Sequence, residues 1–191
     1  PGEALEEALR AKSLDRYSAV IAAWVATTLR LSGKLDAAVI EATRAIELDS
    51  VNPPTQAHAA HAFLAVGRKA DARAAVDRIP RELPLAWAGI VADVHGMSGD
   101  PAPAVRLIRD IEQMRPRPWG AESSLAWASL GIGDTTRALA ALERALDARE
   151  MWPSFFSMLE PMYDPVRHSA RFAALLRRVG LDPALFMAPS R

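Results

Sequence analysis

Apolar residues recur at spacings of three and four along most of the chain, in runs that end at glycine or proline. This period places apolar side chains on one face of an α-helix. No segment alternates apolar and polar residues with β-branched types over five or more positions, so we expect no sheet. The fold class predicted is all-α. The pattern predicts helices at residues 2–14, 18–32, 35–49, 54–66, 69–79, 85–97, 101–114, 119–131, 134–149, 153–162 and 167–179.

The apolar pattern repeats with a period near 34 residues. Gly33, Gly67, Gly99 and Gly133 are separated by 34, 32 and 34 residues. Alanine stands five residues after each glycine and seven residues before it. These two columns are Ala38, Ala72, Ala104, Ala138 and Ala26, Ala60, Ala92, Ala126. Three columns in one register over four copies predict a structural repeat.

The physical reading of one repeat is a helical hairpin. The glycine permits the left-handed backbone that releases the chain from the first helix. The alanines are expected where the paired helices approach most closely, because a larger side chain would push them apart. One hairpin cannot bury both of its faces, so the hairpins should stack.

This pattern resembles the tetratricopeptide repeat family, whose unit is a helix–turn–helix of 34 residues. The small residues and the glycine of the family match the columns above, and its closing proline matches Pro84 and Pro116 but not Ser50 or Glu150. The resemblance implies a right-handed α-solenoid of antiparallel helix hairpins.

The domain organisation expected follows this register. Residues 1–16 are the second helix of a truncated repeat, so we expect the natural protein to continue upstream. Residues 17–150 hold four repeats, at about 19–52, 53–84, 85–118 and 119–152, and residues 151–191 form a degenerate closing repeat with a C-terminal tail. The run from Asp164 to Leu181 is similar to the last segment of tetratricopeptide regions in multidomain bacterial regulators.

The resemblance implies that the first helix of each hairpin lines a concave groove. The residues expected to contact a partner there are Ala23, Thr27, Arg30, Ala57, His61, Leu64, Gly89, Asp93, Met97, Ser123, Trp127 and Leu130. Family members that grip a terminal carboxylate have lysine and asparagine in this groove, and neither occurs here. The groove is instead small and apolar, so it would hold an amphipathic helix or apolar peptide of a partner, or the terminal helix of this chain.

Several residues have spacings that would suit a metal site, a phosphate-binding loop or a catalytic site. His58 and His61 lie one turn apart, and Asp93 and His95 lie on the next first helix, but His61 and Asp93 should be about 10 Å apart. Gly99 and Gly133 lie in small-residue loops that lack the lysine of a phosphate-binding loop. No serine stands in a nucleophile elbow, and the carboxylates of the second helices should face solvent. We therefore predict no metal, no cofactor and no catalytic site.

The tryptophans and a basic cluster near the end of the chain are expected to have structural or partner-binding roles. We expect most tryptophans to pack between hairpins, with Trp127 in the groove as a residue that could anchor a partner. A basic cluster near the end is interpreted first as a solvated helix face and second as a site for an acidic partner. Its members are Arg167, His168, Arg171, Arg177 and Arg178.

Composition narrows the function further. The 191 residues are 50% hydrophobic and 24% charged, with 23 basic residues, 23 acidic residues and no cysteine. A neutral charge balance argues against nucleic-acid binding, and no apolar run is long enough to span a membrane. We predict a cytoplasmic, non-catalytic protein–protein interaction module, the C-terminal part of a larger bacterial signalling or transcription-regulatory protein. The alternatives are a ligand-sensing domain that uses the same groove, and a self-assembly element that pairs through the exposed N-terminal face.

Overall fold

The computed structural model describes residues 2–80, 82, 84–150 and 160–186, and these residues form helices without any strand. The predicted all-α class is therefore confirmed for the part of the chain described. No helix within it has the length and apolar character needed to cross a membrane. The elements are α1 (Gly2–Leu14), α2 (Ala19–Leu31), α3 (Leu35–Leu48), α4 (Pro53–Ala65), α5 (Lys69–Val76), α6 (Leu85–Met97), α7 (Ala102–Gln113), α8 (Ala121–Gly131), α9 (Thr135–Asp147), η1 (Pro161–Tyr163), α11 (Asp164–Arg167), α12 (Ala170–Arg178) and η2 (Pro183–Leu185).

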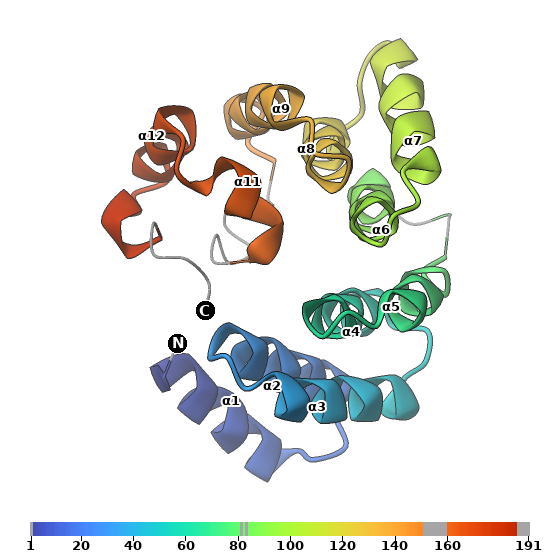
Figure 1. The fold of residues 1–191 in the computed structure, drawn as a ribbon, viewed down its shortest axis with the longest axis vertical. Helices are drawn as coiled ribbons and strands as arrows, with labels where there is room; N and C mark the ends of the chain where they lie inside the picture. The colour runs from blue at the N-terminus through green and yellow to red at the C-terminus, as the bar shows by residue number, and fades with distance from the viewer. Residues whose placement is uncertain (1, 81, 83, 151–159, 187–191) are drawn as a thin grey trace. The chain divides into compact units, whose positions relative to one another are not determined.

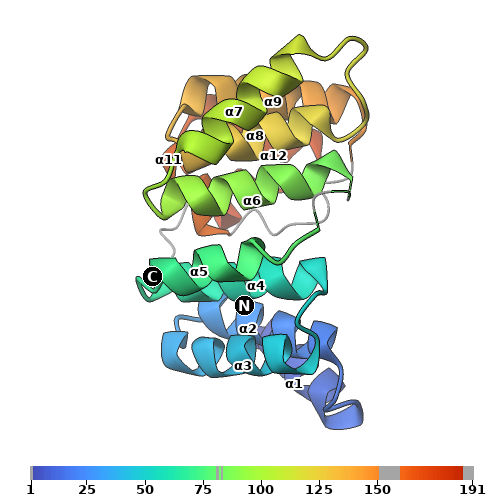
Figure 2. The ribbon, with the colours of Figure 1, turned by 90° about the vertical axis from the view of Figure 1, so that its right-hand side faces the viewer.

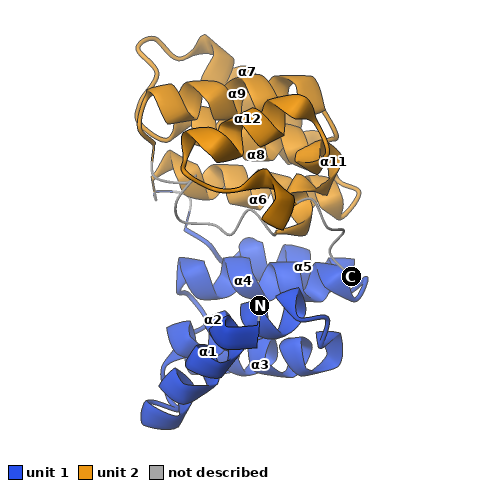
Figure 3. Cartoon of the chain, turned by 90° about the vertical axis from the view of Figure 1, so that its left-hand side faces the viewer, with its two compact units in different colours: residues 1–82, 191 blue, residues 83–190 orange. Residues whose placement is uncertain are grey.

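The helices divide into two compact units, one of residues 1–82 and one of residues 83–190 (Figure 3). In the first unit α2 packs against α3 and α4, α4 packs against α5, and α1 covers α2 (Figures 1 and 2). In the second unit α6 packs against α7 and α8, and α8 packs against α9. The division lies within two residues of the boundary expected between the second and third repeats.

The same turn joins the two helices of four hairpins, α2–α3, α4–α5, α6–α7 and α8–α9. Gly33, Gly67, Gly99 and Gly133 all have positive φ, between 74° and 90°. The residue after each glycine donates its backbone N–H to a carbonyl five residues earlier, as in Lys34 N to Leu29 O at 2.9 Å and Asp134 N to Ser129 O at 2.9 Å. This Schellman-type ending requires a left-handed residue, which explains why glycine recurs at these positions.

The two alanine columns lie in the core. All eight alanines are at most 2% exposed. Leu125, Leu142, Ile108 and Ile111 of the neighbouring apolar columns are also buried, and together they form the packed interior of the second unit. The repeat in the sequence is therefore a repeat of buried small and apolar positions.

Helix bounds agree with the sequence-based expectation to within about three residues from α1 to α9. The largest difference is α5, which ends at Val76 rather than at residue 79. The predicted helix at 153–162 lies mostly outside the described residues. The expected start of the last helix at residue 167 was wrong, because Asp164–Arg167 form a separate short helix and Ser169 Oγ caps α12 by accepting the N–H of Phe172.

Glycines bring α6 and α8 into close contact within the second unit. A Cβ added to Gly96 would lie 2.3 Å from the carbonyl oxygen of Gly131, and one added to Gly89 would lie 2.5 Å from Cα of Ser124. Gly131, the last residue of α8, lies at the same contact, because a Cβ there would lie 2.7 Å from Cα of Asp93. These glycines are needed because the two backbones touch.

Arg167 organises the closing segment after α9. Arg167 is 1% exposed. Its guanidinium donates to the carbonyl oxygens of Glu160 (2.9 Å) and Phe186 (3.2 Å), and it pairs with the carboxylate of Asp164. Arg171 and Arg178 of α12 pair with Glu143 and Asp147 of α9. The interpretation of this segment as one solvated basic face is therefore wrong for Arg167, because its charge is satisfied inside the fold.

Candidate functional site

The residues expected to line the groove are mostly buried. Ten of the twelve are buried, and Leu64 and Met97 are partly exposed. Gly89 is one of the ten, and its burial follows from the contact with Ser124 described above. Side chains this deeply buried offer little surface to a partner, so binding through them would require the covering residues to move.

In the first unit, the expected groove residue Thr27 bonds to the neighbouring helix pair. Its Oγ1 lies 3.0 Å from Nδ1 of His58, and the ring of Trp24 lies 4.6 Å from the ring of His58. His58 is 4% exposed and Trp24 is 39% exposed. The contact between α2 and α4 is thus made by polar and aromatic side chains.

In the second unit, the closing segment contacts the equivalent face of α8. Trp127 Nε1 donates to Tyr163 Oη at 3.1 Å, and the Tyr163 ring stacks on Phe172 at 5.6 Å. Burial raises the pKa of Tyr163 well above its ordinary value, which keeps the phenol neutral. Trp127 is 2% exposed, so it is a packing residue here.

Ser123, another expected groove residue, belongs to the N-terminal cap of α8. Gly120 precedes the helix and has no side chain to cap it. The buried carboxylate of Glu150 accepts the backbone N–H of Ser123 (2.7 Å) and of Glu122 (3.3 Å), and it also accepts the Ser123 hydroxyl. A carboxylate at this position satisfies free N–H groups and complements the helix dipole.

The four residues considered as metal ligands lie on two helices that belong to different units. His58 and His61 lie on α4, whereas Asp93 and His95 lie on α6 in the second unit. Within the described residues there is no group of three or more His, Asp or Glu side chains able to hold a metal ion. His95 Nδ1 lies 3.6 Å from the carboxylate of Asp100, across the turn that follows α6.

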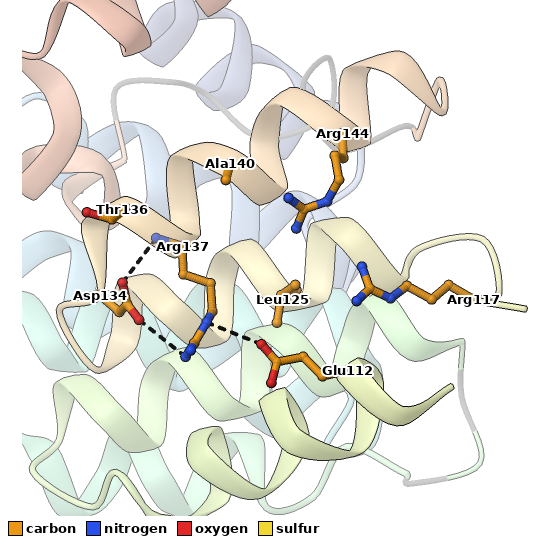
Figure 4. Close-up of a pocket in the computed structure, with 8 residues that line it drawn as sticks. All are labelled: Glu112, Arg117, Leu125, Asp134, Thr136, Arg137, Ala140 and Arg144. Atoms are coloured by element: carbon orange, nitrogen blue, oxygen red, sulfur yellow. Dashed lines mark hydrogen bonds and ion pairs between the residues drawn. The ribbon is translucent and has the colours of Figure 1, made fainter. Parts of the chain in front are cut away.

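An open pocket of about 610 Å³ lies between α7, α8 and α9 in the second unit (Figure 4). We call it the α7–α9 pocket. It is lined by Glu112, Arg117, Leu125, Asp134, Thr136, Arg137, Ala140 and Arg144. Three of these residues are arginines. Figure 4 shows the guanidinium groups of Arg117 and Arg144 directed towards the space around Leu125, and that of Arg137 directed towards Asp134 and Glu112. This arrangement can bind a ligand that carries formal charge.

Ion pairs hold the three arginines in place. Arg137 lies 3.2 Å from Asp134 and 3.4 Å from Glu112. Arg117 and Arg144 share the carboxylate of Glu122, at 2.5 Å and 2.8 Å, and the Glu122 side chain is only 11% exposed. The charged groups that line the pocket are therefore prearranged by the fold.

Sequence reasoning missed this pocket. Glu112 was expected on a solvated outer face, and it is indeed exposed. Arg137 and Arg144 stand seven residues apart on α9. That spacing places both on one helix face and was the available signal. Trp119 also differs from expectation, since it is 56% exposed and stands two residues after Arg117.

Comparison with known proteins finds no family model, no curated protein and no solved structure that matches this chain. Its function must therefore be inferred from its own residues.

Proposed function

We propose that the chain is a non-catalytic protein–protein interaction module built from tetratricopeptide-like helix hairpins stacked in a right-handed manner. The observation that carries the proposal is the α7–α9 pocket, which stays open while most of the expected groove residues are buried. A pocket lined by prearranged charges, with the exposed indole of Trp119 nearby in sequence, has the residue types that bind partners.

The helix pairs support the hairpin part of the proposal. Each uses the same glycine turn and the same two buried alanines, as repeat proteins do when each unit packs on its neighbours. A scaffold of this kind fixes the helices, so that side chains on their surfaces keep constant positions. Arg137 and Arg144 on α9 are held in this way.

A selection from phage-displayed random peptides on the immobilised chain tests the proposal. We expect enriched peptides that bind in solution, measured by fluorescence anisotropy, and lose affinity for an Arg144→Glu variant. Arg109→Glu is the matched control, because Arg109 is exposed on α7 and pairs only with its neighbour Asp110 among the described residues. Selection that enriches no peptide would contradict an interaction function.

The second candidate is the sensing of a small charged ligand, and the three arginines that line the pocket favour it. A screen of charged metabolites by thermal shift separates the two functions. A rise in melting temperature with a metabolite, together with no enriched peptide, would favour sensing.

A further inference from the structure

The charges around the α7–α9 pocket are separated into two ends. At the end that we call the arginine end, Arg117 and Arg144 share one carboxylate, that of Glu122. At the end that we call the acidic end, Glu112 and Asp134 share one guanidinium, that of Arg137. The formal charge is therefore plus one at the first end and minus one at the second.

The arginine end has donors left for a ligand. Arg117 uses Nη1 and Arg144 uses Nε to bind Glu122, and among the described residues neither is within ion-pair distance of another carboxylate. The other guanidinium nitrogens can donate to a further oxyanion. Arg144 is 44% exposed and Arg117 is 29% exposed, so a ligand can reach both, whereas Glu122 lies largely buried between them.

The acidic end can hold a cation. Asp134 is partly engaged as the N-cap of α9, where it accepts the backbone N–H of Arg137 at 3.0 Å. Glu112 is 45% exposed and contacts Arg137 through Oε1 at 3.4 Å, a long ion pair. Its second carboxylate oxygen can therefore accept from an ammonium or guanidinium group.

The apolar side chains that line the pocket are those of Leu125, which is buried, and Ala140, which is partly exposed. Leu125 is 2% exposed and lies at the floor, and Figure 4 shows it between Arg117 and Arg137. Ala140 adds a second apolar side chain on α9. A ligand that fits both ends needs an anionic group and a cationic group joined by a spacer, and an apolar spacer suits the partly exposed Ala140.

We propose that the α7–α9 pocket binds a carboxylate at its arginine end and an ammonium group at its acidic end, as presented by a peptide segment with an acidic and a basic residue separated by apolar residues. The inference rests on the proposed interaction function, because that function supplies the ligand as part of a partner protein. The same chemistry in a free molecule would be a small zwitterion, which the test below separates.

The test measures binding of blocked peptides to the full chain by fluorescence anisotropy. The peptide Glu-Ala-Leu-Lys is compared with versions that carry Gln for Glu, Gln for Lys, or both. We expect the doubly charged peptide to bind best and to lose roughly tenfold in affinity when its acid is removed. Equal binding by all four peptides would overturn the inference.

Variants of the chain give opposite expected directions. Glu122→Gln removes the negative charge at the arginine end but keeps a side-chain oxygen that can accept from Arg117 and Arg144, so it should strengthen binding of the doubly charged peptide by up to about fivefold. Glu112→Gln should weaken binding of the doubly charged peptide and leave unchanged the binding of the peptide that carries Gln for Lys. Arg109→Gln is the control outside the pocket. A gain of affinity in Glu122→Gln is not a result that misfolding produces, and unchanged or weaker binding by that variant would count against the inference.

One more probe distinguishes failure of the inference from failure of the proposed function. The probe is 6-aminohexanoate, a small zwitterion with an apolar spacer, and it is titrated in a thermal-shift assay. If it stabilises the chain and no peptide binds, the pocket is dipolar but the partner is a small molecule. If selected peptides bind without any dependence on Glu112 and Glu122, the interaction function stands and the dipolar site is wrong.

Discussion

The two compact units share one kind of helix pair but differ in how adjacent pairs meet. In the first unit α2 and α4 meet through side chains, with Thr27 bonded to His58 and Trp24 beside it. In the second unit α6 and α8 meet through backbone atoms at Gly96 and Gly131. The glycine turn and the alanine columns, which recur in every pair, thus fix the geometry inside a pair. Positions at which the residue differs from pair to pair, such as Gly96, decide how closely two pairs approach.

The largest effect is expected from closing the glycine contact. Gly96→Ala would place a methyl group 2.3 Å from the Gly131 carbonyl oxygen, so α6 and α8 must separate. We expect a loss of about 3 kcal/mol in the free energy of unfolding, measured by chemical denaturation.

Gly99→Ala is the matched control three residues later. Its φ is 90° and no atom lies within 4 Å of an added Cβ. It should lose only the cost of a left-handed alanine, about 1 kcal/mol. Equal losses for the two variants would show that the close approach of α6 and α8 is not what makes Gly96 necessary.

The helix caps of the two units give the next comparison. Glu150 caps α8 from a distance in sequence, whereas Asn52 caps α4 locally by accepting the Thr55 N–H at 3.1 Å. Glu150→Ala should cost about 2 kcal/mol, because it leaves buried N–H groups of α8 without an acceptor. Asn52→Ala should cost about 1 kcal/mol, both measured by thermal denaturation. The reverse order would mean that Glu150 is not the main cap of α8.

Tyr163 gives a smaller effect with a pH signature. Tyr163→Phe removes the acceptor of Trp127 and should cost about 1 kcal/mol at neutral pH. Because burial raises the pKa of Tyr163 in the folded chain, the wild type should lose stability as the pH rises above about 10. The variant should lose less over that range, and parallel pH profiles of the two proteins would contradict this account.

The smallest effect belongs to the exposed ion pair of Glu143 and Arg171. The hydrogen bond from Arg171 lowers the pKa of Glu143, so the pair stabilises the fold above the unfolded-state value of 4.5 and loses that contribution as the pH falls. Arg171→Gln should cost less than about 1 kcal/mol at pH 7, because the pair is solvated. Urea denaturation at pH 7 and pH 3 should show a difference between the proteins only at pH 7.

The same comparison shows what the sequence could predict. The helix pairs could be predicted from residues such as Gly33 and Ala26. A left-handed turn needs glycine, and a close contact between helices needs a small side chain. The role of Glu150 could not be predicted, because it stands 27 residues from Ser123 and the order of the chain does not show that they meet. The spacing of Arg137 and Arg144 indicated one basic face of α9, but the α7–α9 pocket itself could not be predicted, because Arg144 meets Glu122 across 22 residues of the chain.

Hydrogen–deuterium exchange of the chain with a selected peptide tests the central claim most directly, because it locates the bound partner. The account predicts slower exchange at residues 112–118 and 134–144, which border the α7–α9 pocket, and unchanged exchange across α4. Protection confined to α2 and α4 would contradict it and would place the partner on the face that carries Thr27 and His61.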